Sequence, residues 1–311
     1  MKLFELINTE LINHLNRFET SIVFGQNIIA GSRISGLGKN IENARGCTAF
    51  NSTNSENSLI GMGFGVALTG INSFYLMKQH DFSLLGLDHL VNTTKLMRKI
   101  DLSACFTLLM VVVDNGYEGP QSNLNNLNEF ASLTTTKVHL LDCALSTTLA
   151  FRSKSRPLRI FAISQNGLKR EVDDSNQILI NDEFVFEKNA NNIENKVVVI
   201  NFGLYSRLFE DLKTYLHKNK VPFHTVRQIC IDLVDLKKMN EILSNIECKK
   251  IIVCDTSKSR LLQSKTFVSM ATLKGFDVLN LSYDNLNQFY RVDYDEPIID
   301  INKIDEFLNN E

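Results

Sequence analysis

The chain has 311 residues, of which 44% are hydrophobic, and this length predicts two domains with a core in each. Its 33 basic residues oppose 35 acidic ones, so the net charge of −2 provides no basic field for nucleic acid. The apolar run Leu108–Val113 is far too short to cross a membrane and predicts a buried strand. Acidic and polar residues interrupt the N-terminal segment, which is unlike a secretory signal, and we expect a cytoplasmic protein without a membrane partner.

The six cysteines show no Cys-x-x-Cys spacing, and several lie in or beside apolar runs. We therefore expect buried thiols in a reducing compartment. A redox or metal-binding role is the alternative.

Predicted helices and strands alternate along the chain. Leu3, Ile7, Leu11 and Leu15 are four residues apart and predict an amphipathic helix. The strands predicted in the first part are 21–24, 73–77, 106–113, 138–141 and 158–163, and the helices are 58–69, 82–97 and 144–152. The strands predicted in the second part are 196–201, 223–226, 250–254 and 276–281, and the helices are 206–218, 236–246 and 259–274.

Most of these strands are continuously apolar, which is typical of a parallel sheet covered on both faces. Between the two parts, residues 165–196 are polar and contain one hairpin-like piece, 177–186. We predict an α/β fold with two doubly wound domains. Residues 1–176 would form the first, mainly parallel domain, 177–195 a linker, and 196–311 a smaller α/β domain.

A polar loop at Asn54 and Ser55 leads into a helix whose first turn carries Glu56. Glycines at 61, 63 and 65 leave that helix nearly bare, although each glycine in a helix costs up to about 1 kcal/mol relative to alanine. Three such glycines indicate a close approach by another helix or by a ligand. Taken alone, Glu56 is best explained as a carboxylate that stabilises the start of a helix.

The ordered set of Glu56, the glycine helix, the segment Gln79–Phe82 and the pair Asp88 and His89 resembles a known domain. It is similar to the pyrimidine-binding domain of transketolase-like thiamin-diphosphate enzymes, most nearly to the β subunit of the 2-oxo acid dehydrogenase E1 type. Members carry an aromatic residue 26 positions after the glutamate and an Asp-Gln pair six positions later. Phe82 and Asp88 have this spacing, and His89 stands where the family usually has glutamine. Segments 23–26, 196–203 and 251–255 look like further strands of the family, so the resemblance covers nearly the whole chain.

The resemblance implies a role for each of these residues. Glu56 would hydrogen-bond N1′ of the aminopyrimidine and promote the imino tautomer that takes the C2 proton. Phe82 would stack on the pyrimidine, with Asp88 and His89 completing the cofactor-binding set, and His80 is a further catalytic candidate. The alternatives are a core aromatic for Phe82, a helix-surface residue for Asp88, and hydrogen-bonded core or surface side chains for the two histidines.

The family binds Mg²⁺ and diphosphate through a Gly-Asp-Gly motif, which is missing from this sequence. The resemblance therefore implies no metal site in this chain. A partner, the α-type subunit, would bind Mg²⁺ and the diphosphate half of thiamin diphosphate, and the pair would assemble as an α2β2 heterotetramer.

Two loops depart from known patterns. The segment Glu118–Ser122 lacks the histidine that related enzymes place here, so Gln121 and Ser122 are the candidates for contact with the substrate. An ordinary surface turn at Gly119 and Pro120 is the alternative. Residues 31–38 match neither the Walker A nor the dinucleotide-binding pattern, and we expect a flexible loop at the edge of a cleft.

Three functions fit these features. The first is a catalytic β-type subunit that decarboxylates a 2-oxo acid or a related ketone and transfers the acyl or aldehyde unit. The second is the C-terminal half of a split transketolase, which transfers a ketol unit. The third is a non-catalytic scaffold subunit, motivated by the missing histidine.

Overall fold

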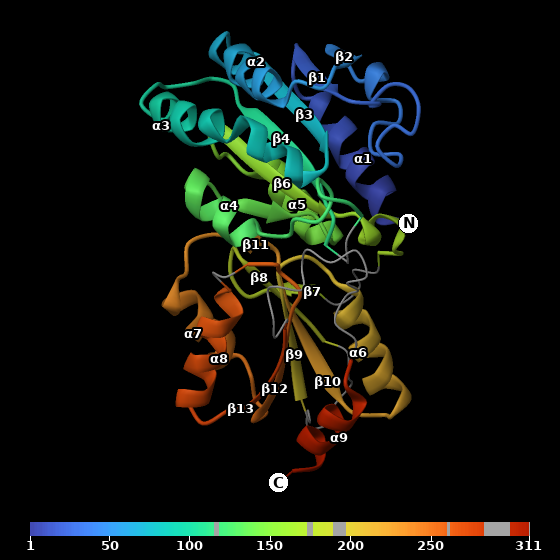
Figure 1. Cartoon of the computed structure of the whole chain (residues 1–311), viewed down its shortest axis with the longest axis vertical. Coiled ribbons are helices and arrows are strands. Elements are labelled where there is room, and N and C mark those ends of the chain that lie inside the picture. The colour runs from blue at the N-terminus through green and yellow to red at the C-terminus, as the bar shows by residue number, and fades with distance from the viewer. Residues whose placement is uncertain (115–117, 173–176, 189–196, 260–261, 283–298, 311) are drawn as a thin grey trace. The chain divides into compact units, whose positions relative to one another are not determined.

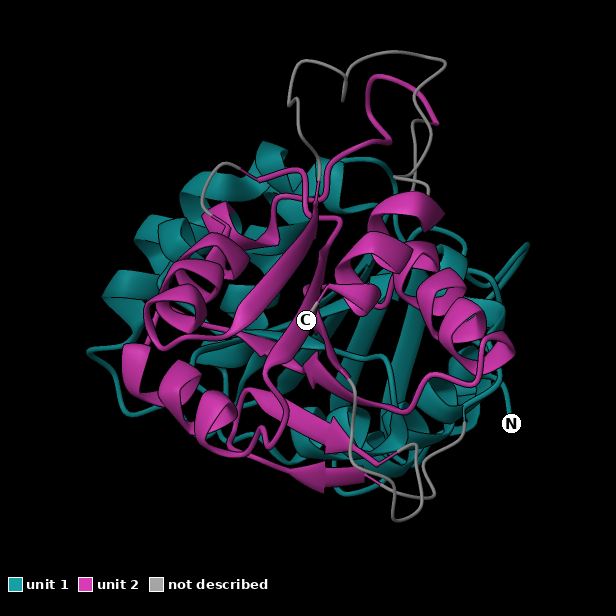
Figure 2. Cartoon of the chain, turned by 90° about the horizontal axis from the view of Figure 1, so that it is seen from below, with its two compact units in different colours: residues 1–113, 130–173 teal, residues 114–129, 174–311 magenta. Residues whose placement is uncertain are grey.

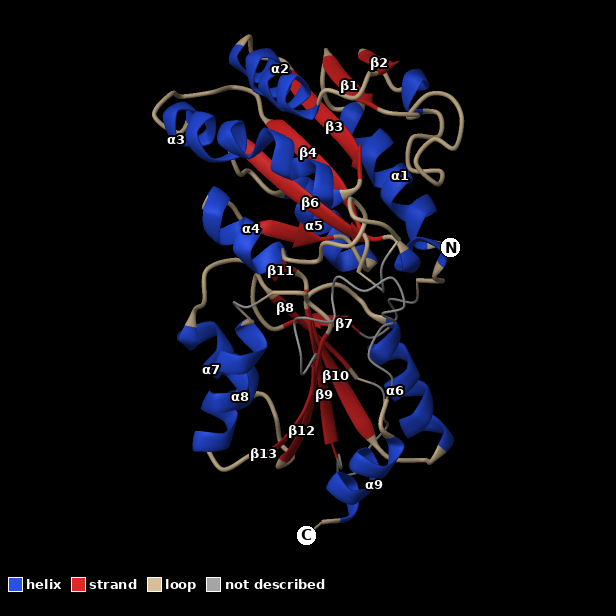
Figure 3. Cartoon of the chain, in the orientation of Figure 1, coloured by secondary structure: helices blue, strands red, loops and turns tan. Residues whose placement is uncertain are grey.

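The computed structural model describes residues 1–114, 118–172, 177–188, 197–259, 262–282 and 299–310, and Figure 3 shows their helices and strands. The chain forms two compact units, coloured separately in Figure 2. One unit comprises residues 1–113 and 130–173, and the other comprises 114–129 and 174–311. Each unit contains a mainly parallel sheet with helices, which confirms the predicted α/β fold class.

The first unit is built on a parallel sheet with the strand order β5-β6-β4-β3-β1-β2 (Figure 1). Its strands are β1 (Ser21–Gly25), β2 (Cys47–Asn51), β3 (Asn72–Lys78), β4 (Phe106–Val112), β5 (Val138–Leu140) and β6 (Leu158–Ser164). Its helices are α1 (Leu3–Leu15), η1 (Ile41–Asn43), α2 (Glu56–Leu68), η2 (His80–Gly86), η3 (His89–Thr93), α3 (Thr94–Met97), α5 (Ala144–Arg152) and η4 (Asn166–Lys169). Helix α4 (Leu127–Thr134) crosses the boundary between the two units.

In this first unit, the strands that the sequence predicted are largely buried, whereas the strand that it missed is partly exposed. Every residue of β4 and β6 is buried, because helices cover both faces of the sheet. The spaced leucines and isoleucine of α1 pack into the same core, as the pattern predicted. Strand β2 was not predicted, because it lies at the sheet edge and none of its residues is fully buried.

The segment predicted as one helix, 82–97, is divided into three pieces. Residues His80–Gly86 form a 3-10 helix, His89–Thr93 a π-helical turn and Thr94–Met97 an α-helix. A Cβ atom at Gly86 would lie 2.3 Å from Cδ1 of Ile60 in α2. This close contact with α2 accompanies the change of helix type, which sequence periodicity does not reveal.

The second unit contains a sheet with the order β13-β12-β9-β10-β8-β7. Its strands are β7 (Gln177–Leu179), β8 (Phe184–Glu187), β9 (Val197–Phe202), β10 (Phe223–Gln228), β12 (Lys250–Asp255) and β13 (Asp277–Ser282), and a short strand β11 (Cys230–Ile231) follows β10. Its helices are α6 (Arg207–Lys218), α7 (Leu236–Ser244), α8 (Gln263–Leu273) and α9 (Ile301–Asn309).

Both faces of this second sheet are covered around its inner strand β9. Val198 and Ile200 of β9 pack in a core with residues of α7 and α8, whereas Val197 and Val199 pack in another core with residues of α6 and α9. Figure 1 shows these two pairs of helices on opposite faces of the sheet. The doubly wound arrangement thus follows from apolar side chains at successive positions of one strand.

The predicted linker, 177–195, was wrong for its first part, because β7 and β8 are strands of the second sheet. They pair with each other, and β8 pairs with β10, in both cases antiparallel. Residues 189–195 lie outside the described part of the chain.

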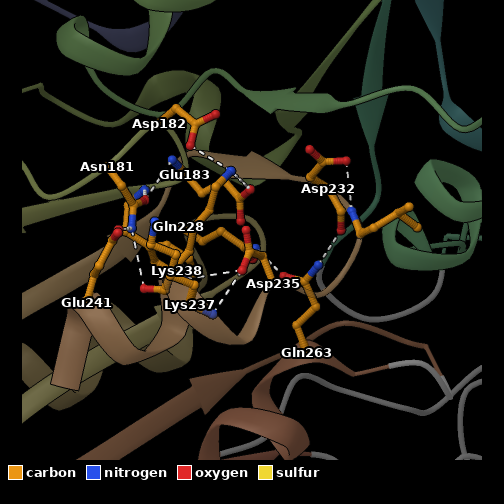
Figure 4. A network of polar contacts seen from close by, with 12 residues as sticks. Asn181, Asp182, Glu183, Gln228, Asp232, Asp235, Lys237, Lys238, Glu241 and Gln263 are labelled. Carbon is orange, nitrogen blue, oxygen red and sulfur yellow. Dashed lines mark hydrogen bonds and ion pairs between the residues drawn. The ribbon is translucent and has the colours of Figure 1, made fainter.

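A network of polar contacts holds this hairpin to α7 (Figure 4). The Nζ atom of Lys238 lies 2.7 Å from Asp182 and also pairs with Glu183. Asn181 accepts hydrogen bonds from the backbone N–H groups of Glu183 and Phe184, and it donates to Glu241 at 3.0 Å. These contacts explain why a polar segment is part of the folded unit.

Residues 114–129 also belong to the second unit, although the prediction placed them in the first domain. The side chain of Asn125 donates to the carbonyl oxygen of Thr256 at 3.1 Å, and the N–H of Lys258 donates to the carbonyl oxygen of Asn125 at 2.7 Å. Both contacts join positions more than 130 residues apart, which sequence composition cannot predict.

All six cysteines are free thiols. Four of them are buried, as predicted, and Cys47 and Cys248 are partly exposed. Among the helices that the structure describes, none combines the length and the apolar character that a membrane crossing requires.

Candidate functional site

Glu56 and Gln26 meet at the carboxyl edge of the first sheet. Gln26 directly follows β1, and Glu56 begins α2 shortly after β2. The amide of Gln26 donates to Oε1 of Glu56 at 3.3 Å, and the Glu56 residue is only 5% exposed. A largely buried carboxylate, hydrogen-bonded by Gln26, thus lies at the positive end of a helix.

The backbone before Gln26 is tightly constrained. A Cβ atom at Gly25 would lie 2.2 Å from the carbonyl oxygen of Leu76 in β3, so only glycine allows this approach. After the strand, the side chain of Asn51 accepts hydrogen bonds from the N–H groups of Ile28 and Ile29 at 2.8 and 3.1 Å. The turn that presents Gln26 is therefore fixed by β3 on one side and by the end of β2 on the other.

An aromatic stack lies across the neighbouring strands β2, β1 and β3. The rings of Phe24 and Tyr75 are stacked at 5.1 Å, and those of Phe24 and Phe50 at 6.0 Å. The three residues are aligned in the parallel register of β2, β1 and β3. Burial raises the pKa of the Tyr75 hydroxyl, and the charge of Glu56 raises it further. The Glu56 carboxylate therefore lies near buried aromatic rings, in a low-dielectric environment where hydrogen bonds are stronger than in water.

The glycines of α2 have three different surroundings. A Cβ atom at Gly63 would lie 2.4 Å from the Phe106 ring, and one at Gly61 would lie 3.0 Å from Nε2 of His89. The same atom at Gly65 would have no neighbour within 4 Å. Close approach to a strand and to the π-helical turn therefore explains two of the three glycines.

The predicted cofactor-binding residues after α2 lie in two neighbouring elements. Phe82 is half-buried in η2, and His89 lies against Gly61 with its Nδ1 3.0 Å from Oγ1 of Thr93. Asp88 is exposed and accepts a hydrogen bond from Asn92 at 2.7 Å. The structure thus places His89 of η3 against α2, the helix that Glu56 begins, whereas Asp88 bonds to a local partner.

His80 is fully buried. Its Nδ1 lies 3.3 Å from Oγ of Ser83, and its ring meets Phe130 edge-on at 4.9 Å. This is the environment of a hydrogen-bonded core histidine, the alternative that the sequence left open.

Gln121 and Ser122 lie in a turn of the second unit. The N–H of Ser122 donates to Gly119, and the N–H of Glu118 donates to Ser122, both at 3.0 Å. Gln121 is exposed, and Ser122 is half-buried. The turn is closed by its own backbone, as its Gly-Pro sequence predicted.

The loop 31–38 is packed against the first unit. Ile34 and Leu37 are buried, and Arg33 pairs with Glu42 at 3.2 Å. Ile34 and Ser35 border a pocket of about 260 Å³, together with Lys78 after the buried part of β3 and Lys169 after β6. In the described residues, no group of three or more His, Cys, Asp or Glu side chains is arranged to hold a metal ion.

The sequence matches no known protein-family profile and no curated protein. A similar solved structure is a split-gene transketolase, described as an inactive β4 tetramer, with a TM-score of 0.57 over 92% of this chain and 90% of that one. The chain has a transketolase-like fold. At 12% identity the likeness concerns the fold and carries no assignment of individual residues.

Within this transketolase-like fold, Gln26 and Tyr75 are neighbours of Glu56 that the sequence did not indicate. Gln26 stands two positions after the predicted strand 21–24, and ligands of parallel sheets bind at the carboxyl ends of strands. The place of Gln26 after a strand was therefore the feature of the sequence that could have identified it. Tyr75 lies inside a predicted strand and is indistinguishable there from any core aromatic.

Proposed function

We propose that this chain is the β-type subunit of a heteromeric thiamin-diphosphate-dependent enzyme and that Glu56 binds the aminopyrimidine half of the cofactor. The observation that carries the proposal is the buried Glu56 carboxylate, hydrogen-bonded by Gln26 at the carboxyl edge of a transketolase-like sheet. Burial of a carboxylate costs free energy, which the hydrogen bond from Gln26 offsets in part.

The residues present fit this half of the cofactor. An ionised carboxylate accepts about four hydrogen bonds, and Gln26 supplies one to Glu56. Glu56 thus retains the capacity to hold a proton at a ring nitrogen, beside the wall formed by Tyr75 and Phe24. When bound, thiamin diphosphate supplies a nucleophilic carbon and an electron sink.

We assign the other predicted residues according to their positions. Phe82 is half-buried and supplies an apolar face for the pyrimidine, and His89 supports the helix beside Gly61. Asp88 completes the cofactor-binding set. The enclosed His80 positions the segment that carries Phe82, and Gln121 and Ser122 supply polar groups for the substrate.

A second chain completes the enzyme in this proposal. The missing Gly-Asp-Gly motif supports an α-type partner that binds Mg²⁺ and the diphosphate, within an α2β2 assembly. The likeness to a chain from a split-gene transketolase is consistent with a divided enzyme. The substrate class that we propose is a 2-oxo acid or a related ketone.

The test is a calorimetric titration of thiamin diphosphate with Mg²⁺ into the chain alone and into the chain co-purified with its partner. Binding is expected only for the pair. Glu56→Gln should preserve assembly and lower turnover by about a hundredfold or more, because it removes the proton-holding carboxylate. The control is Glu19→Gln, an exposed glutamate of the same unit. Near-full turnover of Glu56→Gln in an active pair would contradict the assignment.

A split transketolase is the second candidate. It is favoured by the structural likeness to the split-gene transketolase and by the Glu-Gly-Pro turn at 118–120. Turnover of sugar phosphates but not of 2-oxo acids by the purified pair would establish it. Failure of the assembled pair to bind thiamin diphosphate would instead support the non-catalytic scaffold.

A further inference from the structure

A strongly basic pocket of about 260 Å³ lies at the amino edge of the first sheet. Asn72 begins β3, Cys105 directly precedes β4, and Arg156 shortly precedes β6, so the pocket lies where these parallel strands start. Its charged residues are Arg17, Arg152, Lys154, Arg156 and Arg159. The described lining contains no Asp or Glu side chain, so the positive charge is not neutralised within the pocket.

Arg159 is the deepest of these cations, with only 4% of its surface exposed. Its Nε donates to Oγ1 of Thr107 at 3.1 Å, and its Nη2 lies 3.2 Å from Nε2 of His14. Its Cζ lies 5.8 Å from the ring centroids of Phe74 and Phe161. Thr107, His14 and these two rings are all neutral, whereas buried charges in proteins are normally paired with an opposite charge.

His14 supplies a second and independent observation. The residue lines the pocket and is 6% exposed, and its Nδ1 is buried without a hydrogen-bond partner in the described structure. Burial, followed by the charges of Arg159 and Arg17, lowers the pKa of His14 to about 3, so its ring is neutral at physiological pH. Because Nε2 faces the donating Arg159, Nδ1 carries the ring proton and is a donor without an acceptor.

We propose that this pocket binds a small phosphate-type oxyanion, free or as the phosphate group of a small ester. Arginine presents a planar fork of N–H donors that matches phosphate oxygens, and an anion would supply the charge that Arg159 lacks. Arg17, Arg152 and Lys154 line the mouth and are exposed, so they are accessible to such a ligand.

The pocket is separate from the Glu56 site. It lies at the start of β3 and Glu56 lies near the ends of β1 and β2, so the length of a seven-residue strand, about 20 Å, divides the two edges. The inference is therefore independent of the proposed thiamin-diphosphate chemistry.

The experiment is a calorimetric titration of inorganic phosphate into the full-length chain. We expect saturable binding that the double variant Arg17→Ser/Lys154→Ser weakens by about tenfold or more, since it removes two charged donors. The matched control, Lys95→Ser/Lys99→Ser, removes two exposed lysines of the same unit outside the pocket and should bind phosphate like the wild type. Tighter binding of glycerol phosphate than of inorganic phosphate would identify an ester, and equal affinities would identify free phosphate.

Arg159→Lys tests the buried guanidinium itself. We expect weaker phosphate binding, because lysine lacks the planar set of N–H donors that matches phosphate oxygens. If this variant fails to fold, the exposed double variant still decides the question. Absence of saturable phosphate binding by the wild type would overturn the proposal. Equal affinities of the wild type and Arg17→Ser/Lys154→Ser would overturn it as well.

Discussion

Gln26 and Glu56 are 30 positions apart in the sequence, yet their side chains are hydrogen-bonded at 3.3 Å. The contact depends on β1 and β2 being adjacent and parallel, because both residues follow the carboxyl end of a strand. The hydrogen bond from Gln26 orients the carboxylate of Glu56, and the first turn of α2 fixes the backbone of Glu56.

Replacing Gln26 should therefore reduce the proposed activity without removing the carboxylate. A hydrogen bond to a charged group is worth about 1.5–3 kcal/mol, so Gln26→Leu should lower kcat/KM of the assembled enzyme by at least about tenfold. Steady-state kinetics of the pair measures the effect. Asn57→Ala, an exposed neighbour of Glu56, is the control and should leave kcat/KM unchanged. An unaltered kcat/KM in Gln26→Leu would show that Glu56 needs no such orientation.

Two glycines of α2 should respond to alanine in opposite directions. Gly63→Ala forces a methyl group to within 2.4 Å of the Phe106 ring and should destabilise the fold by about 1–3 kcal/mol. Gly65→Ala meets open space in an exposed helix position and should stabilise it by up to about 1 kcal/mol. Urea denaturation of both variants measures the difference. Destabilisation by Gly65→Ala would indicate that this face of α2 is covered in the protein.

Lys238 should be required for the hairpin of β7 and β8. Lys238→Met leaves Glu183, which is 3% exposed, without its counter-charge and should destabilise the fold by about 3 kcal/mol near pH 7. Lys237→Met, at the exposed neighbouring position, is the control and should change stability little.

The loss in Lys238→Met should also depend on pH. Burial raises the pKa of Glu183, and Lys238 opposes this shift. Without Lys238 the folded state binds a proton more readily than the unfolded chain, so the destabilisation should become smaller as the pH falls toward the pKa of the folded state. Chemical denaturation at two pH values measures this, and an equal loss at both would contradict the role of Glu183.

His14 should make the fold less stable in acid. Its pKa falls from 6.5 in the unfolded chain to about 3 in the folded protein, because of burial and the neighbouring Arg159 and Arg17. Between these values the unfolded chain binds a proton that folded His14 does not bind. The contribution of His14 to the free energy of unfolding is therefore fully present above pH 6.5. Between pH 6.5 and about 3 the free energy of unfolding decreases as the pH falls, by at most about 1.4 kcal/mol per pH unit.

The variant His14→Gln should flatten this pH dependence, because glutamine can accept the hydrogen bond from Arg159 but does not titrate. Urea denaturation of both proteins at several pH values below 6.5 measures the two slopes. His217→Gln, at an exposed histidine, should keep the slope of the wild type. Equal slopes for His14→Gln and the wild type would show that His14 is already protonated when folded.

The order of the elements was largely predictable from the sequence. The run predicted as strand 106–113 is strand Phe106–Val112, because a continuous apolar segment is stable as a strand only when both faces of its sheet are covered. The bare helix after Glu56 and the spacing to Phe82 also pointed to one region of the first sheet. Local patterns carry this information because the hydrophobic period of each element follows from its own geometry.

The three-dimensional neighbours were decided only by the tertiary structure. Gln26 meets Glu56, and the hairpin containing Asn181 joins the second sheet, through contacts between residues that are distant in the sequence. The buried Arg159 beside His14 looks in the sequence like one residue of an apolar strand. Composition and periodicity indicate which residues are buried. The order of the strands in each sheet determines which buried polar groups lie next to one another. For this reason the sequence by itself determined the α/β fold class and Glu56 as a candidate, and the structure decided the partners of Glu56 and the basic pocket at the opposite edge.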